Sequence, residues 1–110
     1  MVNYNGATYI GKNDLKKAVK SFLMTDYPDF EFIFVDNNSK DRSIAIVESL
    51  LNIYSNIKII KNKDNLGFAG GCNVGIEQSD GEFICLVNND DRAINSVWLS
   101  ELMNVLGSDK

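Results

Sequence analysis

The chain has no histidine among its 110 residues. Imidazole is therefore excluded as a metal ligand, as a general base and as the partner of a nucleophile, and acid–base chemistry falls to Asp, Glu, Tyr or Lys. Lysine and arginine number 11 against 15 aspartates and glutamates, which gives a formal net charge of −4. This balance argues against general binding to nucleic acid or to anionic membranes. An anionic ligand would need a cation, backbone N–H groups or a few well-placed basic side chains.

Cysteines and long apolar runs are also scarce. Cys72 and Cys85 match no zinc-binding spacing, and we expect two free thiols, with Cys85 buried inside an apolar run. No apolar run approaches the roughly 20 residues that cross a bilayer. We therefore expect a cytoplasmic protein, either free or peripheral at the membrane. A hydrophobic fraction of 45% suits one globular domain with a single core.

The order of apolar patterns along the chain predicts alternating strands and helices. Helical spacing of apolar residues predicts helices at residues 15–23, 44–54, 68–78 and 97–106. Apolar runs predict strands at residues 30–35, 57–60 and 82–87. Asn13 and Ser96 are placed as helix N-caps, and Gly107 is placed to end the last helix. The expected fold is α/β, with a mainly parallel sheet covered by helices on both faces.

Polar residues gather where strands of this sheet should end. The three clusters are Asn3–Asn5, the stretch from Asp36 to Ser39, and the stretch from Asn88 to Asp91. In open parallel sheets, ligands bind beyond the carboxyl ends of the strands. We therefore expect these clusters, which are distant in sequence, to meet at one edge of the sheet.

The stretch Asn88–Asp91 concentrates oxygen atoms without histidine or thiolate. Such a set suits Mg²⁺ or Mn²⁺, held by one or two carboxylates together with substrate phosphates. The alternative interpretation is an ordinary polar loop between a strand and a helix. Asp36 has the same two interpretations, because a strand-end carboxylate either organises a turn or accepts hydrogen bonds from a base or ribose.

The segment from Asn65 to Ile76, NLGFAGGCNVGI, is dense in glycine. It fits neither G-x-G-x-x-G nor the Gly-Lys-Ser/Thr end of a P-loop. Tight packing of a helix on the sheet is therefore favoured over phosphate binding for the segment taken alone. The amide of Asn73 has no apolar reason to lie among these glycines.

Four motifs in this order carry a resemblance: VNYNG, FVDNNSKDRS, NLGFAGGCNVGI and ICLVNNDD. Together they resemble the nucleotide-sugar half of family 2 glycosyltransferases, and most closely the rhamnosyltransferase-like branch. The resemblance covers essentially all 110 residues. It implies a GT-A fold, in which residues 1–110 are a single donor-binding domain. It also implies that the family's first strand and its acceptor region are missing.

The resemblance implies a nucleotide-binding role for Asn3, Tyr4, Asn5, Asp36, Asn65, Gly67, Asn73, Asn88 and Asn89. Within this set, Asn3 to Asn5 would lie beside the base, and Asp36 would contact the base edge or the ribose. Asp90 is implied as the ligand of a divalent cation, Mn²⁺ or Mg²⁺. Asn88 takes the first acidic place of the family's Asp-x-Asp motif, so its amide is implied to bind the ribose or a metal-bound water.

The implied activity is inverting transfer of a sugar from a nucleoside diphosphate sugar to an acceptor hydroxyl, on a glycan or a lipid-linked acceptor, in cell-surface polysaccharide synthesis. The catalytic base is carried over to no residue and is expected beyond Lys110. The alternative is a non-catalytic nucleotide- or metal-binding fragment of such an enzyme. A phosphoacceptor signalling domain would need a later strand-end lysine, which the chain does not supply.

The absence of a full first strand leads to one further expectation. It would leave neighbouring strands with unpaired backbone edges and uncovered apolar faces, which favour pairing between chains. We therefore expect self-association or marginal stability.

Overall fold

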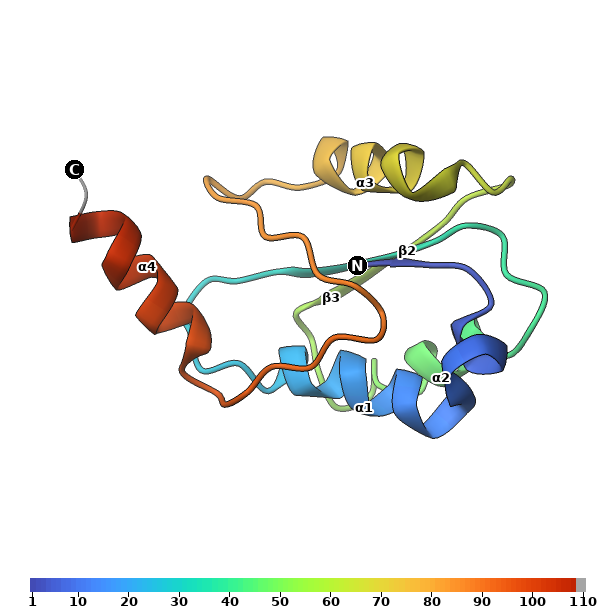
Figure 1. Cartoon of the computed structure of the whole chain (residues 1–110), viewed down its shortest axis with the longest axis horizontal. Coiled ribbons are helices and arrows are strands. Elements are labelled where there is room, and N and C mark those ends of the chain that lie inside the picture. The colour runs from blue at the N-terminus through green and yellow to red at the C-terminus, as the bar shows by residue number, and fades with distance from the viewer. Residues whose placement is uncertain (109–110) are drawn as a thin grey trace.

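The computed structural model describes residues 1–108, which form a parallel sheet between two helical layers (Figure 1). The strands are β1 (Val2–Asn3), β2 (Phe32–Asp36) and β3 (Ile57–Lys61), in the order β1-β2-β3. The helices are η1 (Ala7–Gly11, a short π-helix), α1 (Lys12–Leu23), α2 (Ser43–Glu48), α3 (Gly67–Glu77) and α4 (Trp98–Ser108). Helix α3 covers one face of the sheet, and α1 and α2 cover the other (Figure 1). The predicted α/β architecture is confirmed.

Strand β2 lies at the centre of the sheet and pairs in parallel with both neighbours. Its register with β3 runs from Phe32↔Ile57 to Asp36↔Lys61. Its register with β1 covers only Val2↔Val35 and Asn3↔Asp36. All three strands therefore end at the same edge of the sheet, where their last residues stand side by side.

The main core lies between the sheet and the α1–α2 layer. The predicted apolar stripe of α1 is buried in full and consists of Leu15, Ala18, Val19, Phe22 and Leu23. It packs with Phe34 of β2 and Val47 of α2, while Phe22 stacks on Phe32 at a ring distance of 6.2 Å. Since apolar burial is the main favourable term in folding, this layer supplies most of the stability.

Glycines let α3 approach the other face of the sheet closely. A Cβ atom built on Gly71 would lie 2.7 Å from Val2 Cγ1 and 3.1 Å from Asn37 Nδ2. One turn further on, a Cβ on Gly75 would lie 3.1 Å from Val35 Cγ2. The glycine-dense segment therefore serves tight packing of a helix on the sheet, as its pattern alone favours.

We expect Gly71→Val to destabilise the fold, because the new side chain would push α3 away from β1. Overpacking of this kind costs about 1–3 kcal/mol. Urea unfolding followed by circular dichroism measures the difference. The matched control is Gly107→Val in α4, where a Cβ would meet none of the described residues within 4 Å apart from its own helix backbone and chain neighbours. Equal midpoints for the two variants would show that the approach of α3 to β1 is not tight.

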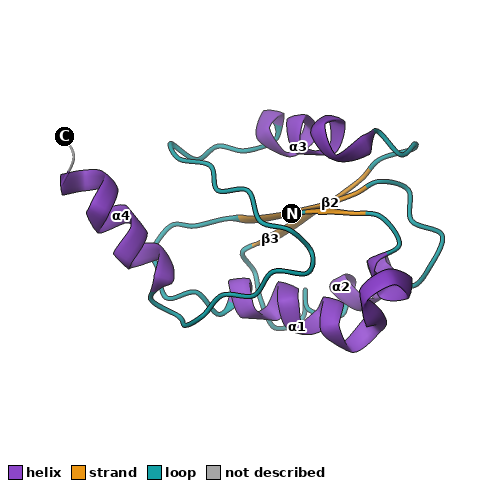
Figure 2. Cartoon of the chain, viewed as in Figure 1, coloured by secondary structure: helices purple, strands orange, loops and turns teal. Residues whose placement is uncertain are grey.

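The predicted strand at residues 82–87 is wrong. The chain between α3 and α4 runs as loop (Figure 2), and it meets the sheet through one isolated bridge, Val2↔Asn88. On this side the sheet offers only the two residues of β1 as a partner, so a longer ladder cannot form. Cys85, expected to be buried, is exposed for the same reason. Both cysteines are free thiols, as predicted.

Several helices and strands also begin or end at residues other than those predicted. Asn13 does not cap α1, because η1 runs directly into the helix and Gly11 takes the cap position with a φ of 95°. Strand β2 starts at Phe32 rather than residue 30, since Asp29 adopts a left-handed φ of 59°. Helix α2 ends at Glu48, well before the predicted residue 54.

The last helix begins at Trp98 and continues through Gly107 to Ser108, so Gly107 does not end it. Ahead of it, the side chain of Asn95 accepts a hydrogen bond from the Val97 N–H at 3.0 Å. Within the described residues, no helix has both the length and the apolar character needed to cross a membrane.

Candidate functional site

Asn3 joins the three strand-end clusters at the carboxyl edge of the sheet. Its Nδ2 donates to Asp36 Oδ1 at 3.0 Å, and its Oδ1 accepts from Asn89 Nδ2 at 2.9 Å. Asn3 is 1% exposed, so its contact with Asp36 is buried, whereas its contact with Asn89 is partly buried. One amide therefore connects the end of β1, the end of β2 and the turn that follows the bridge at Asn88.

Asp36 lies beneath this edge and has no exposed surface. Its Oδ2 accepts from the Ser39 N–H at 2.8 Å, and its Oδ1 accepts from Ser39 Oγ at 2.7 Å as well as from Asn3. The carboxylate thus organises the turn after β2. Contact of Asp36 with a base or ribose, which the resemblance implies, stays a prediction.

The stretch after β1 is fastened to the stretch after β2. Asn5 adopts a left-handed φ of 51°, donates its N–H to Ser39 Oγ at 2.9 Å and accepts from the Lys40 N–H at 2.8 Å. Its neighbour Tyr4 is exposed. Of the three residues implied to lie beside a base, Tyr4 therefore has the side chain most available to a ligand.

Asp41 holds the start of η1 against the same loop. Its Oδ2 accepts from the Thr8 N–H at 2.9 Å and from Thr8 Oγ1 at 3.1 Å, and its Oδ1 accepts from the Ser43 N–H at 2.9 Å. Partial burial acts to raise the pKa of Asp41, but the hydrogen bonds from Ser43 and Thr8 outweigh it and lower this pKa below its ordinary value.

Gly6 is a site residue that the sequence reasoning missed. A Cβ at this position would collide with Asn3 Oδ1 and lie 3.0 Å from Asn89 Nδ2. The glycine of VNYNG therefore makes room for the contact between β1 and the turn at Asn89. Its place directly after the polar cluster is the only signal in the sequence.

Asn37 belongs to the predicted cluster from Asp36 to Ser39, but the sequence assigned it no role of its own; it holds the loop between β3 and α3. It is buried; its Nδ2 donates to the Gly67 carbonyl at 2.9 Å and its Oδ1 accepts from Asn62 Nδ2 at 2.9 Å. Asn65 lies exposed in this loop and accepts from the Gly67 N–H at 3.0 Å, and Gly67 has a φ of 75°. Two residues implied for nucleotide binding, Asn65 in this loop and Gly67 at the start of α3, therefore lie in a segment tied to the end of β2.

Asn73 is not brought into this network. It lies exposed on α3, two residues from Gly71, which is the residue that faces the sheet. The explanation for its amide is therefore a solvent-facing position rather than a place within the packed glycines.

The stretch Asn88–Asp91 forms a tight turn. The Asn88 N–H donates to Asp91 Oδ2 at 2.9 Å, and the Asp91 N–H donates to the Asn88 carbonyl at 3.0 Å. Asn89 is half-buried and faces Asn3, whereas Asn88 and Asp90 are exposed. Asp91 thus shapes the turn, and Asp90 presents its carboxylate to solvent at the tip.

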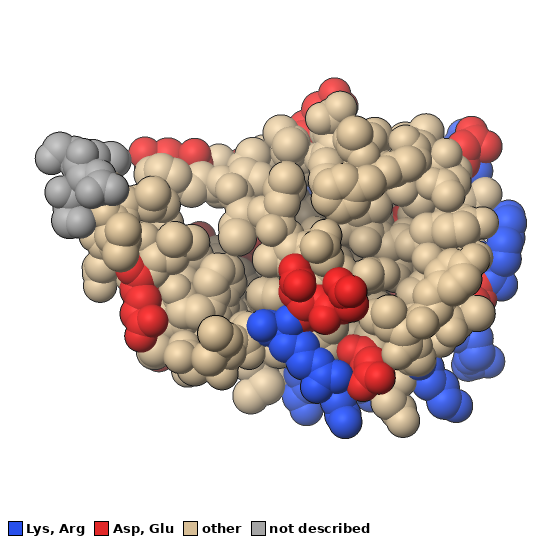
Figure 3. Space-filling model, viewed as in Figure 1, with Lys and Arg blue, Asp and Glu red and all other residues tan. Residues whose placement is uncertain are grey.

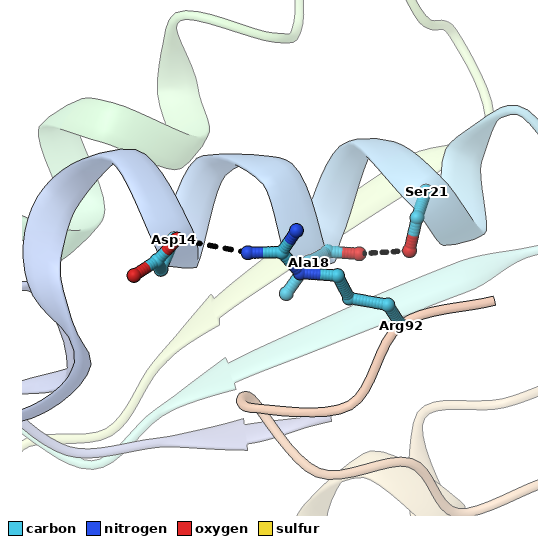
Figure 4. A network of polar contacts seen from close by, with 4 residues as sticks. All are labelled: Asp14, Ala18, Ser21 and Arg92. Carbon is cyan, nitrogen blue, oxygen red and sulfur yellow. Dashed lines mark hydrogen bonds and ion pairs between the residues drawn. The ribbon is translucent and has the colours of Figure 1, made fainter.

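The chain that follows the turn is fastened to α1 (Figure 4). Arg92 forms an ion pair with Asp14 at 2.8 Å. The Ala93 N–H donates to Ser21 Oγ at 3.1 Å, and this hydroxyl donates to the Ala18 carbonyl at 2.7 Å. The turn is therefore held at two points. Asn3 accepts a hydrogen bond from Asn89 within the turn, and the residues directly after the turn contact α1.

The donor set at this edge fits a shared cation rather than an all-protein metal cage. Residues 1–108 contain no group of three or more Asp, Glu or Cys side chains that could hold a metal ion. Mg²⁺ and Mn²⁺, however, are often held by one or two carboxylates with the remaining ligands from substrate phosphates and water. The exposed carboxylate of Asp90 suits that arrangement.

Comparison with known proteins agrees with this architecture. A family model described as "Glycosyl transferase family 2" matches residues 1–110. The GalNAc(5)-diNAcBac-PP-undecaprenol beta-1,3-glucosyltransferase of Campylobacter jejuni is 36% identical over 90 residues, which cover 81% of this chain and 29% of the relative. The poly(ribitol-phosphate) beta-N-acetylglucosaminyltransferase TarS of Staphylococcus aureus is 33% identical over 87 residues, covering 76% of this chain and 15% of the relative.

A solved structure agrees as well. The crystal structure of S. aureus TarS 1–349 in complex with UDP-GlcNAc matches with a TM-score of 0.82 and 29% sequence identity. The match covers 97% of this chain and 30% of the TarS chain. The protein described here therefore spans less than a third of the length of each of these proteins.

Proposed function

The chain belongs to glycosyl transferase family 2, and we propose that it binds the nucleoside diphosphate sugar whose sugar is transferred to an acceptor hydroxyl. The observation that carries the proposal is the joining of β1, β2 and the turn at Asn89 through the single side chain of Asn3. It brings exposed polar groups from several strand ends to one edge, where ligands of parallel sheets bind. The likeness to TarS with UDP-GlcNAc supports a nucleotide sugar at this edge.

In this proposal, the exposed residues touch the donor and the buried ones position them. Tyr4 lies beside the base, and the loop carrying Asn65 and Gly67 lies beside the phosphates. Helix α3 begins at the end of that loop. The N–H groups at its N-terminus favour the negative charge of the donor's phosphates. Asp36 and Asn37 act from beneath, since their side chains are buried and bonded to the chain itself.

Asp90 is the residue that would hold a divalent cation, Mn²⁺ or Mg²⁺, together with the donor's diphosphate. Bound there, the cation would neutralise negative charge on the leaving diphosphate. Asn89 fixes the turn through Asn3, so the Asp90 carboxylate stays at the edge of the sheet. This arrangement also explains how a chain of net charge −4 would hold an anionic nucleotide.

The acceptor side of the reaction is proposed by analogy with the relatives. One of them is named for an undecaprenol-linked glycan and another for poly(ribitol-phosphate). We therefore propose a glycan or lipid-linked acceptor in cell-surface polysaccharide synthesis. None of the described residues is assigned as the base that deprotonates the acceptor hydroxyl.

The test is titration calorimetry with UDP-, dTDP- and GDP-sugars in the presence of Mn²⁺. We expect one class of donor to bind, and the binding to be lost when EDTA removes the cation. The same samples are assayed for release of the nucleoside diphosphate. Failure of every donor to bind at millimolar concentration would contradict the proposal.

A second candidate function is a donor-binding module without turnover. Binding without release of the diphosphate identifies the module, and sustained release identifies the enzyme.

A further inference from the structure

A pocket lined by cations opens to solvent between α1 and α2. Its volume is about 290 Å³. Its lining includes three cations, an amide, a hydroxyl and an apolar group, which belong to Lys12, Lys16, Arg42, Asn13, Ser49 and Ile46. None of the described residues that line it is acidic. Lysine and arginine together with neutral donors are the groups that bind phosphate in proteins.

The pocket continues into a row of lysines along α1. Lys12, Lys16 and Lys20 are spaced four residues apart, so they follow one another on the same side of the helix. Lys17 stands beside this row, and all four lysines are exposed. Like charges at this spacing destabilise a helix. Within residues 1–108 none of the four forms an ion pair, so the helix carries positive charge that an anionic partner would offset.

The acidic side chains of this layer are engaged elsewhere. Asp14, the one acidic residue of α1, forms an ion pair with Arg92 at 2.8 Å. Glu48 of α2 forms an ion pair with Lys61 at 3.2 Å. Asp41, in the loop before α2, accepts hydrogen bonds from η1 and from the start of α2. None of these three acids lines the pocket.

Positive charge is therefore concentrated on the α1–α2 layer. Residues 7–23 and 40–48 hold six of the chain's 11 lysines and arginines but only three of its 15 aspartates and glutamates. Figure 3 shows lysines and arginines along the lower edge of the molecule, where α1 and α2 lie. The basic face consists of Lys12, Lys16, Lys17, Lys20 and Arg42. A chain with a net charge of −4 thus presents one face whose local charge is positive.

Exposed apolar side chains at both ends of the row favour a membrane as the partner. Tyr9 precedes Lys12 by three residues and is 72% exposed, and Met24 follows α1 and is 56% exposed. Basic residues combined with exposed aromatic and aliphatic groups are typical of surfaces that bind anionic bilayers, because tyrosine suits the headgroup level. Duplex nucleic acid offers phosphates without such an apolar layer.

The negative net charge does not prevent this contact. At physiological ionic strength, salt screens charges beyond about 8 Å, so a planar anionic surface acts mainly on the face that meets it. We propose that the basic face docks on a membrane containing anionic phospholipids, with a lipid phosphate in the pocket between α1 and α2.

Sedimentation of the full chain with lipid vesicles tests this proposal. One set of vesicles is an equimolar mixture of phosphatidylcholine and phosphatidylglycerol, and the other is phosphatidylcholine alone. Without nucleotide, the chain should sediment only with the mixed vesicles, and added salt should release it. If the chain does not sediment with mixed vesicles at low salt, the proposal is overturned, while the binding of a nucleotide sugar remains a separate question.

Paired substitutions locate the contact. Lys12→Gln with Lys16→Gln should weaken vesicle binding at least about tenfold, because each basic residue near an anionic surface adds to the affinity. The matched control is Lys58→Gln with Lys63→Gln, which removes the same charge from β3 and the loop after it. Lys12→Arg with Lys16→Arg keeps the charge and should keep the affinity. All these residues are good helix formers, so α1 is retained. An equal loss in the two glutamine pairs would show that net charge alone governs binding, which overturns the proposal.

Two further ligands identify the source of the phosphate. Binding of inorganic phosphate is measured by titration calorimetry, and binding of a labelled DNA duplex by fluorescence anisotropy, both at the ionic strength of the vesicle assay. We expect each to bind more weakly than the mixed vesicles. If either binds at least as tightly, and Lys12→Gln with Lys16→Gln removes that binding, the basic face serves that anion and the membrane proposal is overturned.

Discussion

Asn3→Asp should lower the free energy of unfolding by about 3–5 kcal/mol, which is the cost of leaving a buried charge without compensation. The substitution keeps the shape of the side chain but replaces Nδ2, which donates to Asp36 Oδ1 at 3.0 Å, with an oxygen. Two carboxylates would then face each other in a place that is 1% or less exposed. Because small domains are stable by only about 5–15 kcal/mol, most of the stability would be lost.

Urea unfolding at pH 7, followed by circular dichroism, measures this loss. Asn13→Asp is the matched control, since it makes the same chemical change at an exposed position in the first turn of α1. There a negative charge near the helix N-terminus is neutral or slightly favourable. Equal urea midpoints for Asn3→Asp and Asn13→Asp would show that the hydrogen bond from Asn3 to the buried Asp36 does not stabilise the fold. The proposed link between the ends of β1 and β2 would then be wrong.

The elements that the sequence predicts well are those that a local pattern specifies. The stripe from Leu15 to Leu23 repeats at helical spacing, and every member of it is buried in α1. Strands β2 and β3 are apolar runs bounded by turns, and both form within two residues of the predicted bounds. In each case the signal and the structure it produces lie within the same dozen residues.

The segment 82–87 shows why a local pattern is not sufficient to predict a strand. Its composition is that of a strand, but a strand also needs a partner with free backbone groups along its length. Only Val2 and Asn3 stand on that side of the sheet as strand, and the pattern within 82–87 contains no information about them. The exposure of Cys85 follows from the same missing partner.

The candidate site, too, is predictable from the sequence only in part. The rule that strand ends meet at one edge brings Asn3, Asp36 and Asn89 together, and their hydrogen bonds join them. The rule does not predict which side chains at this edge form hydrogen bonds with one another. Asp36 is buried and Asn37 holds Gly67, 30 residues away, because of contacts that no local spacing encodes. Gly6 matters through a collision that only the folded chain would create.

Asp90→Asn should remove the cation-dependent binding of a nucleotide while leaving the fold intact. In the proposed function, Asp90 is the exposed carboxylate that would share a cation with the diphosphate, and an amide oxygen carries no charge to do so. We expect the affinity for UDP in the presence of Mn²⁺ to fall at least tenfold, which corresponds to about 1.4 kcal/mol. Titration calorimetry with and without the cation measures it.

Two neighbouring aspartates make this prediction specific. Asp80→Asn removes the same charge at an exposed position outside the turn, so its affinity should match that of the unmodified chain. Asp91→Asn weakens the bond from the Asn88 N–H that shapes the turn, so it should affect binding with and without Mn²⁺. Asp90→Asn alone should act only when the cation is present, with a free energy of unfolding changed by no more than about 0.5 kcal/mol, as for other surface substitutions. An unchanged affinity for Mn²⁺–UDP in Asp90→Asn would assign the cation to another group, and the turn at Asn89 would then serve only to shape the edge of the sheet.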